Sequence, residues 1–525
     1  MRPVAALGQA YADLVCETFP ARATYLGVHD HDDRLGEHTA ATFEAFASEL
    51  RALRTELATT RDDGIDARAL DGALATELLA LEQEQQWRRN PEGAIDGALA
   101  ACLALLLRDT APVETRISAL RGRLAELPAF LDGARRTWSD VPRVWSESAH
   151  ETAAAGAAFL RDDLLEAVPE PMRSGSIVDA ATRAADALDA VAAHLRSLPD
   201  SGPWVAGEHV VAQRLRAQHH LTDGPEAIAA RGHALVAETL TRLEELDPDW
   251  RALVARHKDD HPPLDGLLAR YRDEMARTRA FVEEHDVATA TDDPLDVRPS
   301  PRFWAHLVPY AAYDPPGFFE PDSPGVFWVT VPDGDDAAER LRGHAHASVV
   351  LTAIHEGYPG HHLQLTRANR DAGVVAAMAE SPLTVEGWAF YCEEMLLDAG
   401  FDRDDAVMRT FQLKDQLWRA VRVVVDIGLH TGEIDLDAAV DMLVRVADLE
   451  RPNAMDEVRR YTSTPTYQIG YAIGKDEILR LRARCERLDG ASFRIGRFHD
   501  ELLSYGSLPV PLAAEAMLAA REQSE

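Results

Sequence analysis

Lysine is almost absent from this chain of 525 residues, where it occurs only as Lys258, Lys414 and Lys475. The 88 Asp and Glu residues outnumber the 54 Lys and Arg residues, so the formal net charge at pH 7 is −34. Proteins that bind nucleic acids or anionic membranes neutralise phosphate groups with clustered Lys and Arg side chains. The shortage of positive charge therefore argues against a nucleic acid or a membrane as a partner.

Cysteine is also scarce, and its four positions show no C-x-x-C spacing: Cys16, Cys102, Cys392 and Cys485. Cysteines that lie this far apart argue against a disulfide framework or a cysteine-rich zinc site, and we expect reduced thiols. No apolar run approaches the roughly 20 residues of a transmembrane helix. The residues before Asp13 lack the apolar core of a signal peptide. The sequence therefore predicts a cytoplasmic protein.

Hydrophobic residues make up 46% of the chain, and its length exceeds what one compact core usually serves. Apolar residues recur at helical spacing in much of the first half, for example over residues 42–58. We predict a mainly α-helical clamshell of two lobes with a small β-sheet or hairpin beside the active-site helix. The N-terminal helical lobe is expected over residues 1–290 and the catalytic lobe over 291–525.

The strongest candidate metal ligands lie in the string H-E-G-Y-P-G-H-H, which begins at His355. In the zinc motif His-Glu-x-x-His, two imidazoles one helical turn apart hold the metal, and the Glu polarises a water molecule. Here Pro359 occupies the place of the second histidine and cannot bind a metal. Because proline lacks an N–H and clashes with the carbonyl four residues earlier, the helix must end or bulge after Glu356. A loop there can bring His361 or His362 back beside His355.

A catalytic zinc ion usually has three protein ligands and one open position. Glu386 is the third candidate, because it lies in an apolar and aromatic run that predicts a buried helix, where a carboxylate needs a partner. The sequence thus predicts one Zn²⁺ ion within residues 355–386, with Glu356 as the general base.

Two elements are expected next to this motif. Residues 326–331 form the clearest strand candidate. They predict either an edge strand that pairs with an extended substrate or a strand buried in a small hairpin. From residue 335 a helix is expected to continue to Glu356 and to place the motif.

Several strings show a family resemblance: HEGYPGHHLQ from residue 355, VEGWAFYCEE from 385, RAVRVVVDIGLH from 419 and YTSTPTYQIGYAIGKDEILRLR from 461. Together with FPARATYLGVHD from residue 19, they resemble the bacterial DUF885 family over nearly the whole chain. Its members are regarded as gluzincin-like metallohydrolases, distantly similar to thimet-type oligopeptidases and Taq-type carboxypeptidases. The resemblance implies that His361, directly after Gly360, is the second metal ligand. His362 would then hydrogen-bond a ligand or the substrate.

The similarity to thimet-type enzymes also implies a tyrosine that stabilises the oxyanion of the attacked carbonyl group. Tyr471 is the first candidate and Tyr467 the second, although each is equally compatible with packing in a helix interface. Gln468 and Lys475, in the same segment, are candidates for contacts with a ligand or the substrate. Lys475 is equally compatible with a surface pair.

Two arginines and a histidine complete the candidates. Arg419 and Arg422 can each hold a substrate carboxylate through two hydrogen bonds, or form ion pairs with Asp415 or Asp426. His430 lies one helical turn after Asp426, so this pair either contacts the site or lies on the helix surface.

These features predict a zinc-dependent hydrolase that cleaves the amide bond of a short peptide or peptide-like small molecule, in a cleft between two helical lobes. Three alternatives remain. One is a helical peptide-binding or scaffold protein with a vestigial metal site, and another is a small-molecule amide hydrolase. The third is a non-haem iron enzyme, because two histidines and a carboxylate also bind Fe(II).

Overall fold

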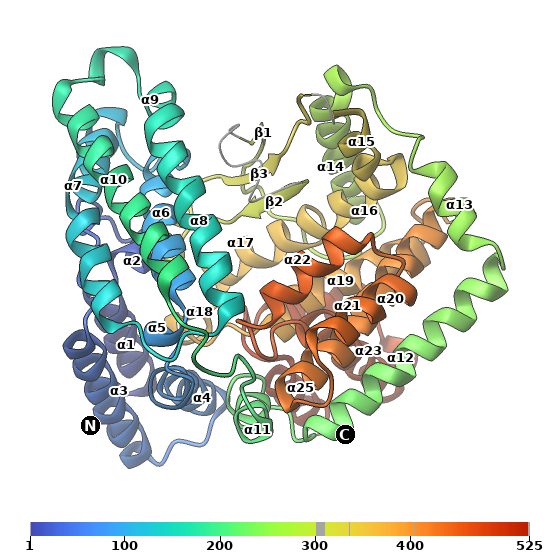
Figure 1. Cartoon of the computed structure of the whole chain (residues 1–525). Helices are drawn as coiled ribbons and strands as arrows, with labels where there is room; N and C mark the ends of the chain where they lie inside the picture. Colours follow the sequence, from blue (N-terminus) through green and yellow to red (C-terminus); the bar gives the residue numbers. More distant parts are fainter. Residues whose placement is uncertain (1, 301–309, 335–336, 404, 523–525) are drawn as a thin grey trace. The chain divides into compact units, whose positions relative to one another are not determined.

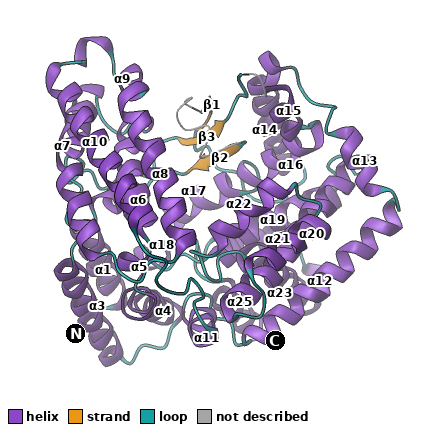
Figure 2. Ribbon diagram, viewed as in Figure 1, coloured by secondary structure: helices purple, strands orange, loops and turns teal. Residues whose placement is uncertain are grey.

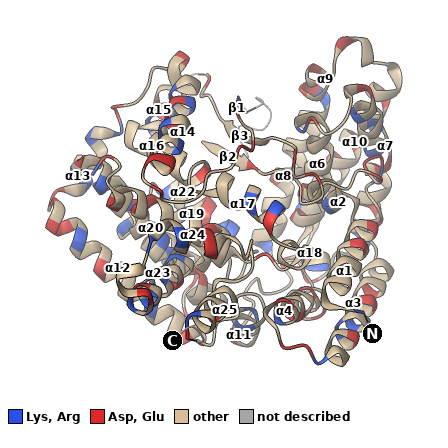
Figure 3. Ribbon diagram, turned by 180° about the vertical axis from the view of Figure 1, so that it is seen from behind, with Lys and Arg blue, Asp and Glu red and all other residues tan. Residues whose placement is uncertain are grey.

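The computed structural model describes residues 2–300, 310–334, 337–403 and 405–522. Within these ranges the chain is mainly helical and contains one small sheet, as the sequence predicts (Figure 1, Figure 2). The four cysteines are unpaired and buried. Acidic and basic residues are interspersed along the helices in the view of Figure 3. In the described ranges no single helix is long and apolar enough to cross a membrane. The bent pair Ile65–Arg89 and Pro91–Leu107 reaches that length and apolar composition only when the two helices are taken together.

The contacts of the chain divide it into two compact units, which consist of residues 1–206 with 317–323 and of residues 207–316 with 324–525. This boundary differs from the predicted division at residue 290. The reason is that α12 (Pro225–Leu246) packs along α20 (Ala406–Thr431). Gly232 of α12 lies so close to Val423 of α20 that a Cβ would meet its side chain at 2.8 Å. The helices between residues 207 and 290 therefore belong with the predicted metal ligands.

The first unit is a set of amphipathic helices. In α7 (Val113–Thr137), Leu120, Leu124, Leu127 and Leu131 recur at helical spacing and are at most 1% exposed, as expected for a helix with one apolar face. The helices of this unit are α1 (Val4–Thr18), α2 (Pro20–Leu26), α3 (Ala40–Thr60), α4 (Ile65–Leu79), α5 (Gln86–Arg89), α6 (Pro91–Leu107), α7 (Val113–Thr137), α8 (Arg143–Asp162), α9 (Leu164–Ala167) and α10 (Gly175–Ser197).

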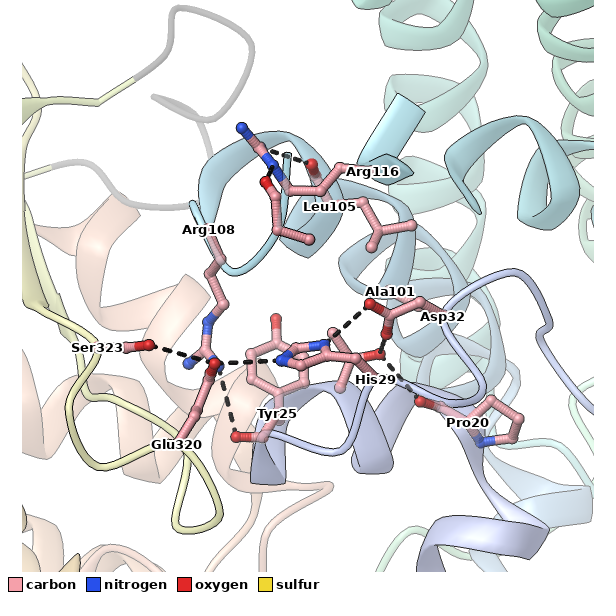
Figure 4. A network of polar contacts seen from close by, with 12 residues as sticks. Pro20, Tyr25, His29, Asp32, Ala101, Leu105, Arg108, Arg116, Glu320 and Ser323 are labelled. Carbon is pink, nitrogen blue, oxygen red and sulfur yellow. Dashed lines mark hydrogen bonds and ion pairs between the residues drawn. The ribbon is translucent and has the colours of Figure 1, made fainter. Parts of the chain in front are cut away.

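A network of polar contacts attaches residues 317–323 to the N-terminal helices of this unit (Figure 4). The ring nitrogens of His29 lie 2.9 Å from Asp32 Oδ2 and 3.1 Å from Glu320 Oε2. The hydrogen bonds to Asp32 and Glu320 raise the pKa of His29 to about 9. Conversely, although burial opposes their charge, the contacts with His29 lower the pKa of both Asp32 and Glu320. His29 is therefore charged at neutral pH.

This network predicts a pH window for stability. The contribution of His29 is complete below its ordinary pKa of 6.5 and is lost as the pH rises through about 9. The two carboxylates contribute above their ordinary pKa, and that contribution is lost as the pH falls through their lowered values. We expect the melting temperature of wild type to exceed that of His29→Gln near pH 6, and the difference to shrink towards pH 10. The exposed His209→Gln is the control, and a difference constant with pH would contradict the prediction.

The second unit contains the sheet and the remaining helices. Its other elements are α11 (Glu208–Ala217), α13 (Trp250–His257), α14 (Leu267–Glu284), β1 (Leu295–Pro299), β2 (Ala311–Asp314), β3 (Gly325–Val329), α15 (Ala337–Leu341), α16 (His346–Glu356), α17 (His361–Asp371), α18 (Val374–Met378), α19 (Pro382–Ala399), α21 (Leu436–Arg445), α22 (Arg451–Tyr461), α23 (Ile469–Asp489), α24 (Ile495–Leu503) and α25 (Val510–Glu522).

The predicted strand is present, but it lies in the middle of the sheet. The strand order is β1-β3-β2, and β3 pairs parallel to β1 and antiparallel to β2. All five residues of β3 are buried, where Phe327 and Val329 pack against Tyr271 of α14 and Val349 of α16. The interpretation of residues 326–331 as an edge strand that pairs with substrate is therefore wrong. The alternative of a buried strand is confirmed, but this strand belongs to a three-stranded mixed sheet rather than to a hairpin alone.

The helix expected from residue 335 to the metal motif is interrupted. Residues 335 and 336 lie outside the described ranges, and α15 is followed by a 3₁₀ turn, Arg342–His344. Ala345 then takes an extended conformation with ψ 148° before α16 begins. The physical reason is the burial of His344, whose Nδ1 and the Tyr271 hydroxyl share a 3.0 Å hydrogen bond in the core.

Two helices approach each other closely through glycine. Gly387 of α19 faces Gly474 of α23, and a Cβ on Gly474 would collide with the carbonyl oxygen of Leu383. This contact places Glu386 beside the start of α23. We expect Gly474→Ala to lower the free energy of unfolding by about 1–3 kcal/mol through overpacking.

Thermal or denaturant unfolding measures this effect. The matched control is Gly97→Ala in the interior of α6, where an added Cβ has no atom within 4 Å. That exchange is expected to raise stability by about 0.5–1 kcal/mol, because alanine favours a helix over glycine. Equal effects of the two exchanges would show that α19 and α23 do not require their close approach.

Candidate metal centre

The helix that contains the first predicted ligand ends where the sequence predicts. α16 ends at Glu356, and Gly357 leaves the helical conformation with φ −104° and ψ −106°. The next helix begins at His361. In the turn between them, Gly360 is required because a Cβ there would collide with the carbonyl oxygen of His355. The turn is therefore built from the residues that interrupt the familiar zinc motif.

This turn brings two histidines together. The rings of His355 and His361 have centroids 4.8 Å apart and planes at 86°. Trp388 of α19 supports the turn, because its Nε1–H donates a 2.8 Å hydrogen bond to the carbonyl oxygen of Pro359. Two residues before Trp388, α19 contributes Glu386 to the same place.

The three predicted ligands form one cluster. One ligand atom each from His355, His361 and Glu386 lies within 4.8 Å of the other two. Glu386 Oε2 is 3.8 Å from His355 Nε2 and 3.5 Å from His361 Nε2. Both distances exceed a hydrogen bond and approach the roughly 3.3 Å between two ligands of a tetrahedral zinc ion. Each residue is only 9% exposed, so donor type, spacing and burial fit one zinc ion.

The electrostatics of this cluster also suit a cation. Although burial opposes a negative charge, the imidazoles of His355 and His361 hold the pKa of Glu386 well below its ordinary value. Burial likewise opposes a charge on His355, but Glu386 and Glu393 raise the pKa of His355 to about 10. The buried carboxylates thus favour a positive charge at this place, and a bound metal ion would supply it instead of a proton on His355.

Two further side chains orient the ligands. Glu393 Oε1 accepts a 2.7 Å hydrogen bond from His355 Nδ1, which leaves Nε2 to face Glu386. Tyr467 donates a 2.6 Å hydrogen bond to the other oxygen of Glu386. Sequence reasoning missed Glu393. The available signal is its spacing of seven residues from Glu386, which places both carboxylates on one face of α19.

His362 takes part in a different set of contacts. Its Nδ1 accepts a 2.9 Å hydrogen bond from the Tyr313 hydroxyl, and its Nε2–H donates a 3.2 Å bond to the carbonyl oxygen of Asp293. Burial lowers the pKa of His362 to about 4, so the ring is neutral. Gly325 leaves room for the contact between Tyr313 and His362, because a Cβ on Gly325 would collide with the Tyr313 hydroxyl. The structure therefore places His361, rather than His362, in the ligand cluster.

The predicted general base and the first-choice oxyanion donor lie close to the cluster. Burial raises the pKa of Glu356, and the nearby His361 and His355 partly counteract this rise. Burial and the charge of Glu386 raise the pKa of Tyr471, so its hydroxyl remains a donor. In the described part of the chain, neither Glu356 nor the Tyr471 hydroxyl has a hydrogen-bond partner.

Lys475 and Gln468 belong to other networks. Lys475 is buried rather than at the surface. Its Nζ lies 2.5 Å from Glu394 Oε2 and donates a 2.7 Å hydrogen bond to Gln416. The backbone N–H of Gln468 donates a 3.0 Å hydrogen bond to Asp426 Oδ2. These two residues therefore support the packing of α19, α20 and α23.

Asp426 and His430 are buried as well, so their interpretation as a helix-surface pair is wrong. Asp426 Oδ1 accepts a 3.1 Å hydrogen bond from the backbone N–H of Thr466, which holds the turn that contains Tyr467. His430 Nε2–H donates a 2.9 Å hydrogen bond to the carbonyl oxygen of Tyr461. Asp426 thus positions a residue of the site, whereas His430 links α20 to α22.

The two arginines have acidic neighbours. Arg422 donates a 2.9 Å hydrogen bond to Glu457, a partner that the sequence interpretation did not include. Arg419 NH1 lies 3.6 Å from Asp415 Oδ1, beyond hydrogen-bonding distance. The expected ion pair of Arg419 is therefore present only as a loose contact.

Comparisons with known proteins agree with the fold. The model of the family described as "Bacterial protein of unknown function (DUF885)" matches residues 20–517. No curated protein matches the chain. A solved structure of a provisionally named lipoprotein of unknown function from Shewanella oneidensis is 22% identical, with a TM-score of 0.80 over 99% of this chain and 100% of that chain. A provisionally named lipoprotein from Colwellia psychrerythraea is 17% identical, with a TM-score of 0.85 over 99% of both chains.

Proposed function

This chain belongs to the DUF885 family, and we propose that it is a zinc-dependent hydrolase that cleaves an amide bond in a short peptide or peptide-like molecule. The supporting observation is a buried cluster of His355, His361 and Glu386 next to the unpartnered carboxylate of Glu356. This donor set leaves one ligand position for a water molecule or substrate, as in catalytic rather than structural zinc sites.

The proposed chemistry assigns a task to each group. Bound zinc would act as a Lewis acid towards the substrate carbonyl and make water more acidic. Glu356 accepts the proton of the attacking water and delivers it to the leaving nitrogen, and its raised pKa suits both steps. Tyr471 donates a hydrogen bond to the oxyanion that forms on the carbonyl oxygen. Glu393 and Tyr467 keep His355 and Glu386 oriented.

The order of the groups along the chain supports a relationship with gluzincin-like peptidases. Two histidines and a glutamate come from one helix–turn–helix segment, a third ligand comes from the next long helix, and tyrosines follow in a later segment. We propose this relationship together with the activity, because the order of these groups matches the one implied by the sequence resemblance.

Removal of the metal tests the proposal directly. Treatment with a chelator is expected to abolish cleavage of a mixed library of short peptides, and one equivalent of zinc is expected to restore it. Elemental analysis of the untreated protein should find one zinc ion per chain. Recovery with iron(II) but not with zinc would contradict the zinc assignment, and undiminished cleavage by metal-free protein would contradict the hydrolytic mechanism.

A further inference from the structure

Two arginines of α20 stack on aromatic rings close to the metal centre. The guanidinium carbons of Arg419 and Arg422 lie 4.4 Å and 4.2 Å from the ring centroid of Trp418. Those of Arg422 and Arg419 also lie 5.0 Å and 5.9 Å from the ring of Tyr471. Stacking on a ring face orients a guanidinium and leaves its N–H edge available for an anion.

Positive charge exceeds negative charge in this cluster, in a chain whose net charge is strongly negative. Two carboxylates pair with four cationic side chains: Glu457 with Arg422 and Arg460, and Asp415 with Arg419 and Lys414. The hydroxyl of Tyr461 also donates a hydrogen bond to Glu457. Because each carboxylate is shared, neither neutralises its arginine fully.

The arginines also retain unused hydrogen-bond donors. Nε and NH1 of Arg419, Nε of Arg422 and Nε1 of Trp418 are buried and have no hydrogen-bond partner among the described residues. Arg422 as a whole is only 4% exposed. A buried donor without a partner costs about 1–3 kcal/mol, so several such donors in one place indicate a ligand that accepts hydrogen bonds.

A succession of contacts links the arginines to the metal ligands through Tyr471 and Tyr467. Tyr467 contacts Glu386, and the ring of Tyr467 has its centroid 6.3 Å from that of Tyr471. The charges of Glu386, Arg422 and Arg419 all act on the Tyr471 hydroxyl. Two aromatic rings thus stand between the ligand Glu386 and the arginines in this succession of contacts. The 6.3 Å between their centroids equals about two residues of extended peptide at roughly 3.3–3.6 Å per residue.

We propose that Arg419, with Arg422 and Trp418 beside it, binds the free C-terminal carboxylate of the substrate, so that the enzyme removes short fragments from the C-terminus of peptides. This inference rests on the proposed hydrolytic function. A carboxylate matches the planar donor edge of a guanidinium, and it supplies the negative charge that the cluster lacks. Arg419 is the principal donor, because Arg422 is already hydrogen-bonded to Glu457.

The first test compares pairs of short peptides without Asp or Glu, each as the free acid and as the C-terminal amide. Wild type is expected to cleave the free acids at least tenfold faster in kcat/KM, and Arg419→Gln is expected to lose roughly 10- to 100-fold on the acids only. Arg409→Gln, in the same helix but paired with Asp398, is the control. Equal rates on acids and amides by wild type, or an equal loss on both by Arg419→Gln, would overturn the proposal.

A binding measurement separates this inference from the proposed function. Calorimetric titration with N-acetylphenylalanine and with its carboxamide needs no turnover. Tighter binding of the acid to wild type, lost in Arg419→Gln, supports the carboxylate site even if no peptide is cleaved. Equal affinity for acid and amide overturns it, whether or not the protein proves to be a hydrolase.

Discussion

Replacement of Glu356 by glutamine is expected to lower the rate of peptide hydrolysis by roughly 10²- to 10⁴-fold, the usual contribution of a general acid–base group. Glutamine has nearly the same shape as glutamate but cannot accept the proton of the attacking water. Because Glu356 is not among the three clustered ligands, the variant is expected to keep one zinc ion per chain. Initial rates on the peptide library, together with elemental analysis, measure both quantities.

The exposed Glu433→Gln variant provides the matched control for this experiment, since it makes the same exchange in the same unit. Its rate and its zinc content should equal those of wild type. If Glu356→Gln cleaved as fast as wild type, the assignment of the base would be wrong. If it lost its zinc, Glu356 would have to be counted among the ligands.

The second large effect concerns the choice between adjacent histidines. His361→Gln is expected to weaken zinc binding by more than 100-fold, because loss of a residue that merely supports a ligand already costs roughly 10- to 100-fold. His362→Gln should retain one zinc ion, since His362 contacts Tyr313 and Asp293 instead of the cluster. Competition with a chromogenic chelator measures both affinities.

Because His362 is fully buried, its replacement also tests packing. Tyr313→Phe removes only the hydroxyl that donates to His362 and offers a milder probe of the same contact. This variant should fold and keep its zinc. A loss of zinc in Tyr313→Phe that matched the loss in His361→Gln would show that His362 acts as a ligand after all.

The agreement between prediction and structure is best where the cause is local. Proline and glycine after Glu356 end the helix through backbone sterics alone, and the structure shows the end of α16 at that residue. Glu386 was predicted because a carboxylate in an apolar helix needs a partner, and the partners are His355 and His361. Both arguments use physical chemistry that a short segment already contains.

Predictions about partners across the fold were less complete. Glu393 orients His355 from 38 positions away, and Glu457 pairs with Arg422 from 35 positions away. No spacing rule connects such pairs, because their contact depends on how α16, α19, α20 and α22 pack. The central position of β3 and the boundary near residue 206 depend on packing in the same way.

By itself, the sequence determined the helical class, the break in the zinc motif and the candidate ligands His355 and Glu386, because helical periodicity, proline sterics and the cost of a buried carboxylate act locally. Only the tertiary structure decided that His361 rather than His362 faces Glu386, since the choice depends on Tyr313 and Asp293 holding His362 elsewhere. It also revealed the unused donors of Arg419. Both depend on contacts between segments that folding alone brings together.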